Sequence, residues 1–287
     1  MRRILTAITV ILSATLMASS AFAEQITADL VKVSTPVYTP EFTDFSPALG
    51  TYSYDVSWQG IPAAGATITV SRDNGRYRVI VQARTYSGID IFYKLRYRAE
   101  GLISATDFSP EKLVVDHQEN SRFKNEQVVF DEKGEIFAVR SQRGKPEVKT
   151  LRFTPDNFTL EPLSAAFLAR SLDWKVGQSR DFDIFNSKSR YLITLTAEDR
   201  VSMKINGEKK DVFVIVPTVK NLTDPGNEKK LHEAKIYVTA DGARDIVKIV
   251  SSVFVGSVTT ELEEFVPETP APVVLARAQM GKKAFVK

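Results

Sequence analysis

Apolar and polar residues alternate along much of this chain with a period of two, which is the pattern of β-strands that bury one face. In 52–58, Tyr52, Tyr54, Val56 and Trp58 occupy every second position, with polar residues between them. The alternation recurs in the first half of the chain over 64–71, 76–87, 92–100, 112–123, 127–131 and 135–142. These segments predict an antiparallel meander.

Tight turns divide the alternating segments into hairpins. Asp73-Asn74-Gly75 and Asn206-Gly207 each place residues that accept a positive φ between two alternating runs. Strands of the second half are predicted over 180–185, 191–205, 212–216 and 234–238, followed by a hairpin over 244–265 that bends at Gly256. A polar loop over 221–230, which contains Asp224-Pro225-Gly226, interrupts this half.

One segment departs from the period of two and predicts a short helix over 163–170. Glu161-Pro162 opens it with proline at a tolerated first-turn position, and Arg170 lies near its end, where a cation suits the helix dipole. Leu163, Phe167 and Arg170 then share one face. Many strands and a single helix predict an all-β fold, either a strongly curved antiparallel sheet or a partly open β-barrel, with the helix covering one end.

The first 23 residues have the features of a secretory signal peptide. Arg2 and Arg3 precede an apolar run over 4–17, and Ala21-Phe22-Ala23 supplies the small-x-small cleavage motif. The run is too short for a spanning helix, which needs roughly 20 apolar residues, so we interpret it as a cleaved signal rather than a membrane anchor. The mature chain then begins at Glu24 and is expected in the periplasm, without a lipid anchor because no cysteine follows the cut.

Cleavage of the signal changes the charge of the chain. It removes two of the 38 basic residues and none of the 35 acidic ones, so the net charge falls from +3 to about +1. We divide the rest into an extended lead-in over 24–49, a single β domain over 50–266, and a Pro-rich linker and basic, flexible tail over 267–287. The basic excess lies in the tail and not in the β domain. This argues against a nucleic-acid partner, because phosphate binding needs a concentrated positive patch on the folded part.

The chain offers little of the chemistry that catalytic or metal sites need. It has no cysteine and two histidines, His117 and His232, neither beside an acid and a nucleophile at a meaningful spacing. Asp181 and Asp183 share a strand face but lack the glycine and the further oxygen ligands of a calcium loop. We therefore predict no enzyme activity, no metal and no cofactor, with two carboxylates brought together by folding as the alternative.

Aromatic residues are concentrated in the first strands and around the helix. They suit either a filled hydrophobic core or an apolar groove in a curved sheet, and the sequence leaves both possibilities open. The candidate groove residues are Tyr52, Tyr54, Trp58, Tyr77, Phe92, Leu163, Phe167 and Trp174.

Three segments in combination resemble the domain-of-unknown-function 3108 family of exported bacterial proteins. They are Tyr54-Asp55-Val56-Ser57-Trp58-Gln59-Gly60-Ile61-Pro62-Ala63-Ala64-Gly65, then 163–167 with Trp174 and Val176-Gly177-Gln178, and then 236–242 with Val255-Gly256-Ser257-Val258 and Glu261-Leu262. The resemblance spans about residues 50–265 and departs from the family pattern at 243–247, where a proline is common. It implies a periplasmic or outer-membrane-associated β protein, similar in architecture to envelope lipoprotein carriers that bind acyl chains. It brings no catalytic residues.

These features together predict a non-catalytic periplasmic protein. Its ligand is expected to be apolar or lipid-like and to bind in a groove of the curved sheet beneath the helix, in maintenance of the cell envelope. The alternative is an envelope assembly or scaffold protein that contacts a protein partner through its surface and its basic tail. After signal cleavage, neither function requires a nucleic acid or a membrane span.

Overall fold

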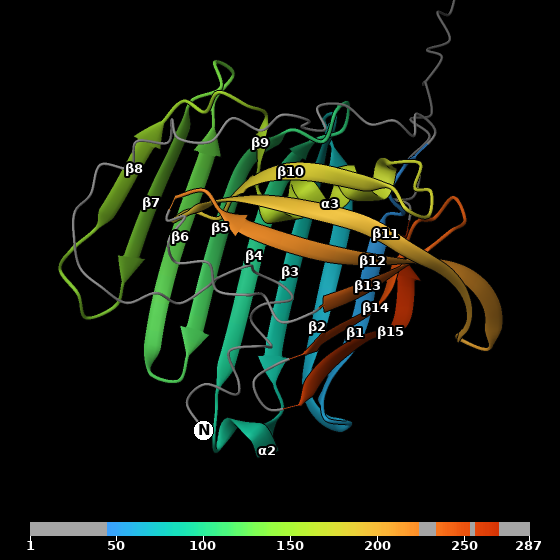
Figure 1. Cartoon of the computed structure of the whole chain (residues 1–287). Coiled ribbons are helices and arrows are strands. Elements are labelled where there is room, and N and C mark those ends of the chain that lie inside the picture. Colours follow the sequence, from blue (N-terminus) through green and yellow to red (C-terminus); the bar gives the residue numbers. More distant parts are fainter. Residues whose placement is uncertain (1–44, 224–233, 253–255, 270–287) are drawn as a thin grey trace, which may run out of the picture.

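The computed structural model describes residues 45–223, 234–252 and 256–269, which form one 15-stranded sheet around a short helix (Figure 1). Several predicted features lie outside the described residues: the signal segment 1–23, most of the lead-in, Asp224-Pro225-Gly226, His232 and the tail from residue 270 onward.

The first half of the sheet is a meander in which each strand pairs with the next. Its strands are β1 (Gly50–Trp58), β2 (Ile61–Asp73), β3 (Arg76–Thr85), β4 (Leu95–Ser104), β5 (Pro110–Glu119), β6 (Arg122–Phe130), β7 (Ile136–Gln142) and β8 (Lys149–Phe153). A helical turn, α2 (Ser87–Asp90), connects β3 to β4. In β3 the residues Tyr77, Val79 and Val81 are buried while their neighbours are more exposed, so the period of two selects the core side chains.

The second half is a meander that leads back to the first strand. Its elements are β9 (Thr159–Leu160), α3 (Pro162–Ser171), β10 (Ser179–Phe185), β11 (Arg190–Ile205), β12 (Glu208–Asn221), β13 (Ala234–Thr239), β14 (Ile246–Ser252) and β15 (Ser257–Pro267). β15 pairs with all of β1, from Gly50 opposite Pro267 to Trp58 opposite Val258, and joins the two meanders into one sheet. Among the described strands, β9 and β10 form the one parallel pair.

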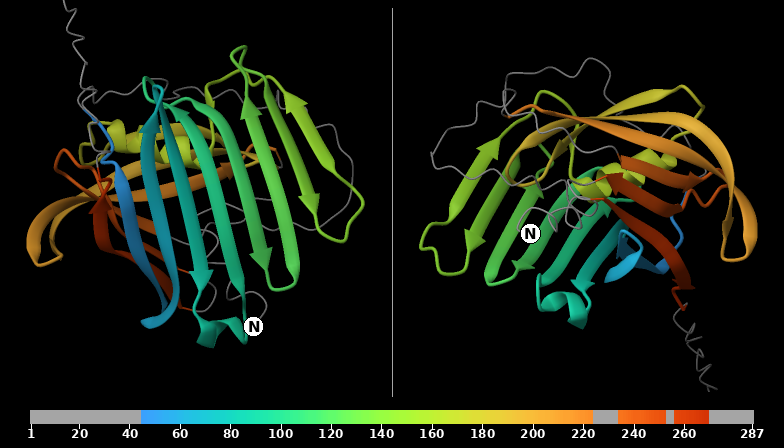
Figure 2. Two further views of the ribbon diagram at one scale, coloured as in Figure 1. Left: turned by 180° about the vertical axis from the view of Figure 1, so that it is seen from behind. Right: turned by 60° about the horizontal axis from the view of Figure 1, so that its bottom comes forward.

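The sheet curves back over itself, with β10–β12 crossing in front of the inner face of the first meander and α3 between the two walls (Figures 1 and 2). It does not close, because the strand order ends at β8 on one side and β9 on the other. The walls meet where the rings of Phe153 and Phe185 lie 5.1 Å apart, and where Ser187 donates a hydrogen bond to Glu126 on β6. The prediction of a strongly curved, incompletely closed all-β sheet is confirmed.

Some local expectations differ from the structure. The predicted strand over 112–123 is two strands, because Asn120 adopts a φ of 54° and begins a tight turn between β5 and β6. The strand predicted over 92–100 starts only at Leu95, after α2, which is a second helix that the sequence did not predict. β8 and β9 were not predicted either, since strands of five and two residues are too short to show a period.

Helix α3 begins where the sequence supplies its own cap. The side chain of Glu161 accepts hydrogen bonds from the backbone N–H of Leu163 at 2.7 Å and of Ser164 at 2.6 Å, while the Ser164 hydroxyl accepts one from the Glu161 N–H. This capping box satisfies donors that a buried helix end would otherwise leave unpaired. α3 has ten residues, and no helix in the described part of the chain is long and apolar enough to cross a membrane.

Gly101 on β4 makes room for this end of the helix. A Cβ atom at position 101 would lie 3.0 Å from Cδ1 of Leu163 and 3.5 Å from Oε1 of Glu161. Any side chain at this position would therefore press on the capped turn. The close approach of α3 to the sheet depends on the absence of a side chain here.

Gly101→Val should lower the free energy of unfolding by about 2 kcal/mol, because the branched side chain overpacks the contact with α3. Valine favours a strand, so a loss would report the steric conflict rather than strand propensity. Urea unfolding followed by circular dichroism measures the change. Gly242→Val is the control, since a Cβ there meets no atom within 4 Å. Equal stability of the two variants would contradict the role given to Gly101.

Candidate functional site

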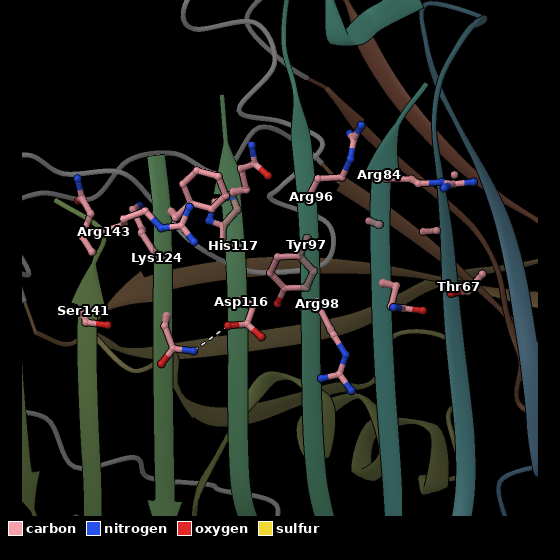
Figure 3. A pocket seen from close by; sticks show the side chains of 18 of the residues that line it. Thr67, Arg84, Arg96, Tyr97, Arg98, Asp116, His117, Lys124, Ser141 and Arg143 are labelled. Atoms are coloured by element: carbon pink, nitrogen blue, oxygen red, sulfur yellow. Dashed lines mark hydrogen bonds between the residues drawn. The ribbon is translucent and has the colours of Figure 1, made fainter. Parts of the chain in front are cut away.

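Two rows of side chains cross the outer face of β1–β7, which is the face turned away from α3 (Figure 3). The cross-strand register forms the first row from Ser53, Thr67, Gln82, Arg98, Asp116, Asn125 and Ser141. The second row, two residues along each strand, consists of Asp55, Gly65, Arg84, Arg96, Gln118, Phe123 and, just after β7, Arg143. Residues between the rows, such as Ala66 and Ala83, point the other way and are buried.

These rows form the floor of a trough with a volume of about 970 Å³. At one end Tyr86 lies over Gly65, where a Cβ would be 3.4 Å from the tyrosine hydroxyl, and this hydroxyl donates to Asp55 at 2.6 Å. At the other end the guanidinium carbon of Arg143 lies 4.0 Å from the centre of the Phe123 ring. Aromatic side chains therefore flank the trough, which we call the outer-face trough.

The outer-face trough is positively charged. The side chains on its face include five basic residues, Arg84, Arg96, Arg98, Arg143 and Lys145, and two acidic ones, Asp55 and Asp116. Arg98 pairs with Glu100 at 2.7 Å, and Arg96 pairs with Asp90, whose carboxyl pKa it holds at about 2. Within the described part of the chain, Arg84 and Arg143 have no carboxylate at ion-pair distance, so their charge is available to an anion.

Two titratable side chains near the trough, His117 and Asp116, lie on opposite faces of the sheet. His117 points to the opposite face, where its ring meets that of Tyr97 with centroids 6.0 Å apart, and burial lowers its pKa to about 4. Asp116 on the floor accepts a hydrogen bond from Asn125 at 2.7 Å. Among the described residues, no three His, Cys, Asp or Glu side chains are grouped so that they could hold a metal ion.

The residues predicted to line an inner groove lie mainly in the hydrophobic core. Those that are at most 9% exposed and belong to one cluster are Tyr52, Tyr54, Tyr77, Phe167 and Trp174. Trp58 and Leu163 are half-buried and pack against this cluster. Phe92 does not join them, because it follows α2 at the end of the sheet and is 76% exposed. Phe167 belongs to α3 itself, and the centre of its ring lies 5.8 Å from that of Tyr77 on β3.

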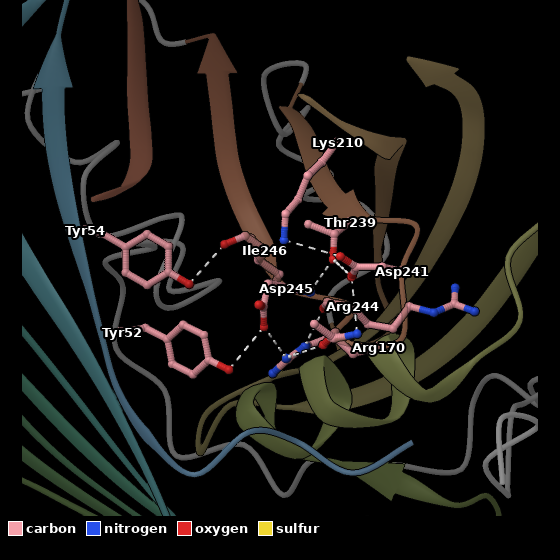
Figure 4. A network of polar contacts seen from close by, with 10 residues as sticks. Tyr52, Tyr54, Arg170, Lys210, Thr239, Asp241, Arg244, Asp245 and Ile246 are labelled. Atoms are coloured by element: carbon pink, nitrogen blue, oxygen red, sulfur yellow. Dashed lines mark hydrogen bonds and ion pairs between the residues drawn. The ribbon is translucent and has the colours of Figure 1, made fainter. Parts of the chain in front are cut away.

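Arg170 ties the end of α3 to the turn between β13 and β14 (Figure 4). Its guanidinium donates to the carbonyl of Arg244 at 2.7 Å and to that of Ala243 at 3.1 Å, and it lies 2.9 Å from Oδ1 of Asp245. Tyr52 donates to the same carboxylate oxygen at 3.1 Å, and burial raises the pKa of its hydroxyl to about 12. The network thus links α3 to both β1 and β14.

The residues of the outer-face trough were not predicted as a site. Arg84, Arg96 and Arg98 stand at the polar positions of β3 and β4, which the alternating pattern assigns to the solvent side. Only the strand register shows that these side chains lie next to one another across the sheet. The register is set by turns such as the one at Asn120. The available signal was the number of arginines at the polar positions of adjacent strands.

Comparisons with known proteins bear on the family and the fold. A family model described as "Protein of unknown function (DUF3108)" matches residues 53–263, which confirms the resemblance noted in the sequence. The fold is similar to that of a β-barrel-like protein of domain of unknown function DUF1849 from Brucella abortus, with a TM-score of 0.53, 9% identity, and 78% of this chain and 99% of that chain covered. A putative lipoprotein from Parabacteroides distasonis aligns with a TM-score of 0.31, 11% identity, and 77% and 97% coverage. No curated protein matches the chain.

Arg170→Met should lower the free energy of unfolding by about 3 kcal/mol, because it removes the cation that pairs with the Asp245 carboxylate and the donor of two backbone carbonyls. The double variant Arg170→Met with Asp245→Asn should regain part of this loss, since it removes the uncompensated charge. Urea unfolding of wild type, both single variants and the double variant measures the coupling. Strictly additive losses would show that the two side chains are not coupled.

Glu161 should make the protein less stable as the pH rises through about 7. Burial raises the pKa of this carboxyl from 4.5 to about 7, so the folded chain binds the proton more tightly than the unfolded chain. The resulting stabilisation is on the order of 3 kcal/mol. It is complete below the pKa that the carboxyl has in the unfolded chain, and it is lost as the pH rises through the pKa in the folded chain. The free energy of unfolding of wild type minus that of Glu161→Gln should therefore fall between about pH 5 and pH 8. A constant difference would contradict this assignment.

Proposed function

The chain belongs to the family described as "Protein of unknown function (DUF3108)", and from that premise we propose that it is an exported, non-catalytic protein that binds an anionic polysaccharide along the outer-face trough. One observation carries the proposal: Arg84 and Arg143, which have no carboxylate at ion-pair distance among the described residues, lie beside an unbroken cross-strand row of polar side chains. Export is supported by the basic start, apolar run and cleavage motif of residues 1–23.

The dimensions of the trough favour an extended ligand. The first row takes one residue from each of seven adjacent strands, from Ser53 on β1 to Ser141 on β7. Neighbouring strands are spaced ~4.8 Å apart, so the row is roughly 30 Å long. A polymer that runs across the strands would meet the whole row, whereas a single small anion would use only a part of it.

The chemistry of the lining favours an acidic sugar chain. Hydroxyl and amide side chains such as Thr67 and Gln82 can exchange hydrogen bonds with sugar hydroxyls. Guanidinium groups bind carboxylates with two parallel hydrogen bonds, which suits Arg84 and Arg143 to the acid groups of such a chain. The ring of Phe123, which the Arg143 guanidinium covers on one face, adds an apolar surface beside the charge.

The acids around the trough support a binding role over a catalytic one. Asp90, Glu100 and Asp116 are engaged by Arg96, Arg98 and Asn125 respectively. Each carboxylate is thus held by a donor rather than left to exchange protons. The proposal also places the ligand on the outer face rather than beneath α3, because the predicted inner-groove side chains pack as core around the helix.

Isothermal titration calorimetry with polygalacturonate tests the proposal, with neutral dextran as the uncharged comparison. We expect wild type to bind polygalacturonate and not dextran, and the affinity to decrease as salt is added. Arg84→Ala with Arg143→Ala should weaken binding at least tenfold, because each substitution removes a charge-assisted contact.

The matched control is Lys204→Ala with Lys209→Ala. These lysines are exposed on the β11–β12 hairpin and do not line the trough, so the control removes the same charge from another surface. Equal losses in the two double variants would reduce the effect to net charge and contradict a site in the trough. Absence of any heat with polygalacturonate would contradict the proposal as a whole.

A further inference from the structure

Exposed apolar side chains gather at one end of the sheet. The described chain has seven large hydrophobic residues that are exposed, and five of them lie at this end: Ile61, Tyr86, Ile91, Phe92 and Val148. They come from the β1–β2 turn, the α2 segment and the loop before β8, which the strand pairing brings to the same side. We call this side the α2 end; it lies at the bottom of Figure 1.

The two most exposed of these residues are displayed by a firmly held loop. Ile91 is 78% and Phe92 76% exposed. The backbone N–H groups of Phe92 and Tyr93 both donate to the carbonyl of Ile89 at 2.9 Å, and Asp90 is bonded to Arg96. Tyr93 turns inward and is 6% exposed. The protein therefore holds two adjacent large apolar side chains out into solvent, at the end of the sheet where the other exposed apolar residues lie.

Basic residues surround this apolar tip. Arg84, Lys94 and Arg122 are exposed, and Lys94 is joined to the β5–β6 turn by its N–H, which donates to Asn120 at 2.9 Å. The basic residues Arg143 and Lys145 follow β7 at the same end. Two nearby acids are engaged, since Asp90 pairs with Arg96 and Glu119 accepts a hydrogen bond from Tyr93, while Glu147 is exposed beside Val148. The α2 end is thus apolar at its tip and cationic around it.

We propose that the α2 end docks onto the surface of an anionic lipid bilayer, with Ile91 and Phe92 entering the interface and Lys94 and Arg122 contacting lipid headgroups. In this arrangement two terms contribute to the free energy of membrane binding. They are the burial of apolar side chains in the headgroup region and the attraction between anionic lipid and basic residues within a Debye length of the surface. A protein partner fits the surface less well, because protein interfaces have apolar centres that are depleted of lysine, whereas here the apolar residues stand on separate turns among basic ones.

Co-sedimentation with vesicles tests the proposal on the purified chain. Wild type should bind vesicles of phosphatidylcholine and phosphatidylglycerol in equal parts, and should bind pure phosphatidylcholine vesicles at least tenfold more weakly. Ile91→Ser with Phe92→Ser should reduce binding to the anionic vesicles at least tenfold. The matched control is Val176→Ser with Val266→Ser, which changes exposed apolar residues away from the α2 end and should bind like wild type.

A second pair of substitutions keeps the outcome interpretable. Lys94→Glu with Arg122→Glu should abolish the preference for anionic lipid while leaving polygalacturonate binding intact, since neither residue lines the outer-face trough. Circular dichroism verifies the fold of each variant. Equal binding to both kinds of vesicle, or unchanged binding after Ile91→Ser with Phe92→Ser, would overturn the proposal. Failure of wild type to bind either vesicle would also overturn it and would favour a protein partner.

Discussion

The pairing of β1 with β15 is the contact on which the continuity of the sheet depends. These strands begin and end the folded region, and all nine residues of β1 are paired with β15. Without the pair, β1 and β15 would each become an exposed edge strand, and the two meanders that enclose α3 would no longer belong to one sheet. The contact joins distant parts of the chain, so forming it costs the entropy of closing a long loop. The short-range hairpins on either side reduce this cost when they form first.

Helix α3 gives the curved sheet a filled interior. Its apolar residue Phe167 packs in the same cluster as Tyr77 and Trp174, and each end of the helix is fixed by a buried ionisable group. Glu161 caps the first turn, and Arg170 binds the turn before β14. A buried polar group is tolerated only where its hydrogen-bond partners are in place. Glu161 and Arg170 therefore fix the orientation of the helix, whereas its apolar residues require only that it is buried.

The sequence was sufficient for most of the elements and for the fold class, but not for the site. Alternation and the Asn-Gly turns predicted most strands, and Glu161-Pro162 predicted the start of α3, because these signals are local. Whether Tyr52 and Phe167 line a groove or fill a core depends on how far apart two walls lie, which no local pattern encodes. The row that contains Arg84 depends on the register of several hairpins, and Phe92 was misplaced because α2 breaks the strand that was predicted around it.

The open sheet leaves two terminal strands, and their composition limits what can be added to them. β8 is five residues long and carries Lys149 and Arg152, while β9 has two residues and runs parallel to its neighbour. Charged side chains and short length are the features by which edge strands resist pairing with other chains. A sheet that could in principle be extended by a second copy thus ends in strands that make such extension unfavourable, which protects an unclosed fold from linear aggregation.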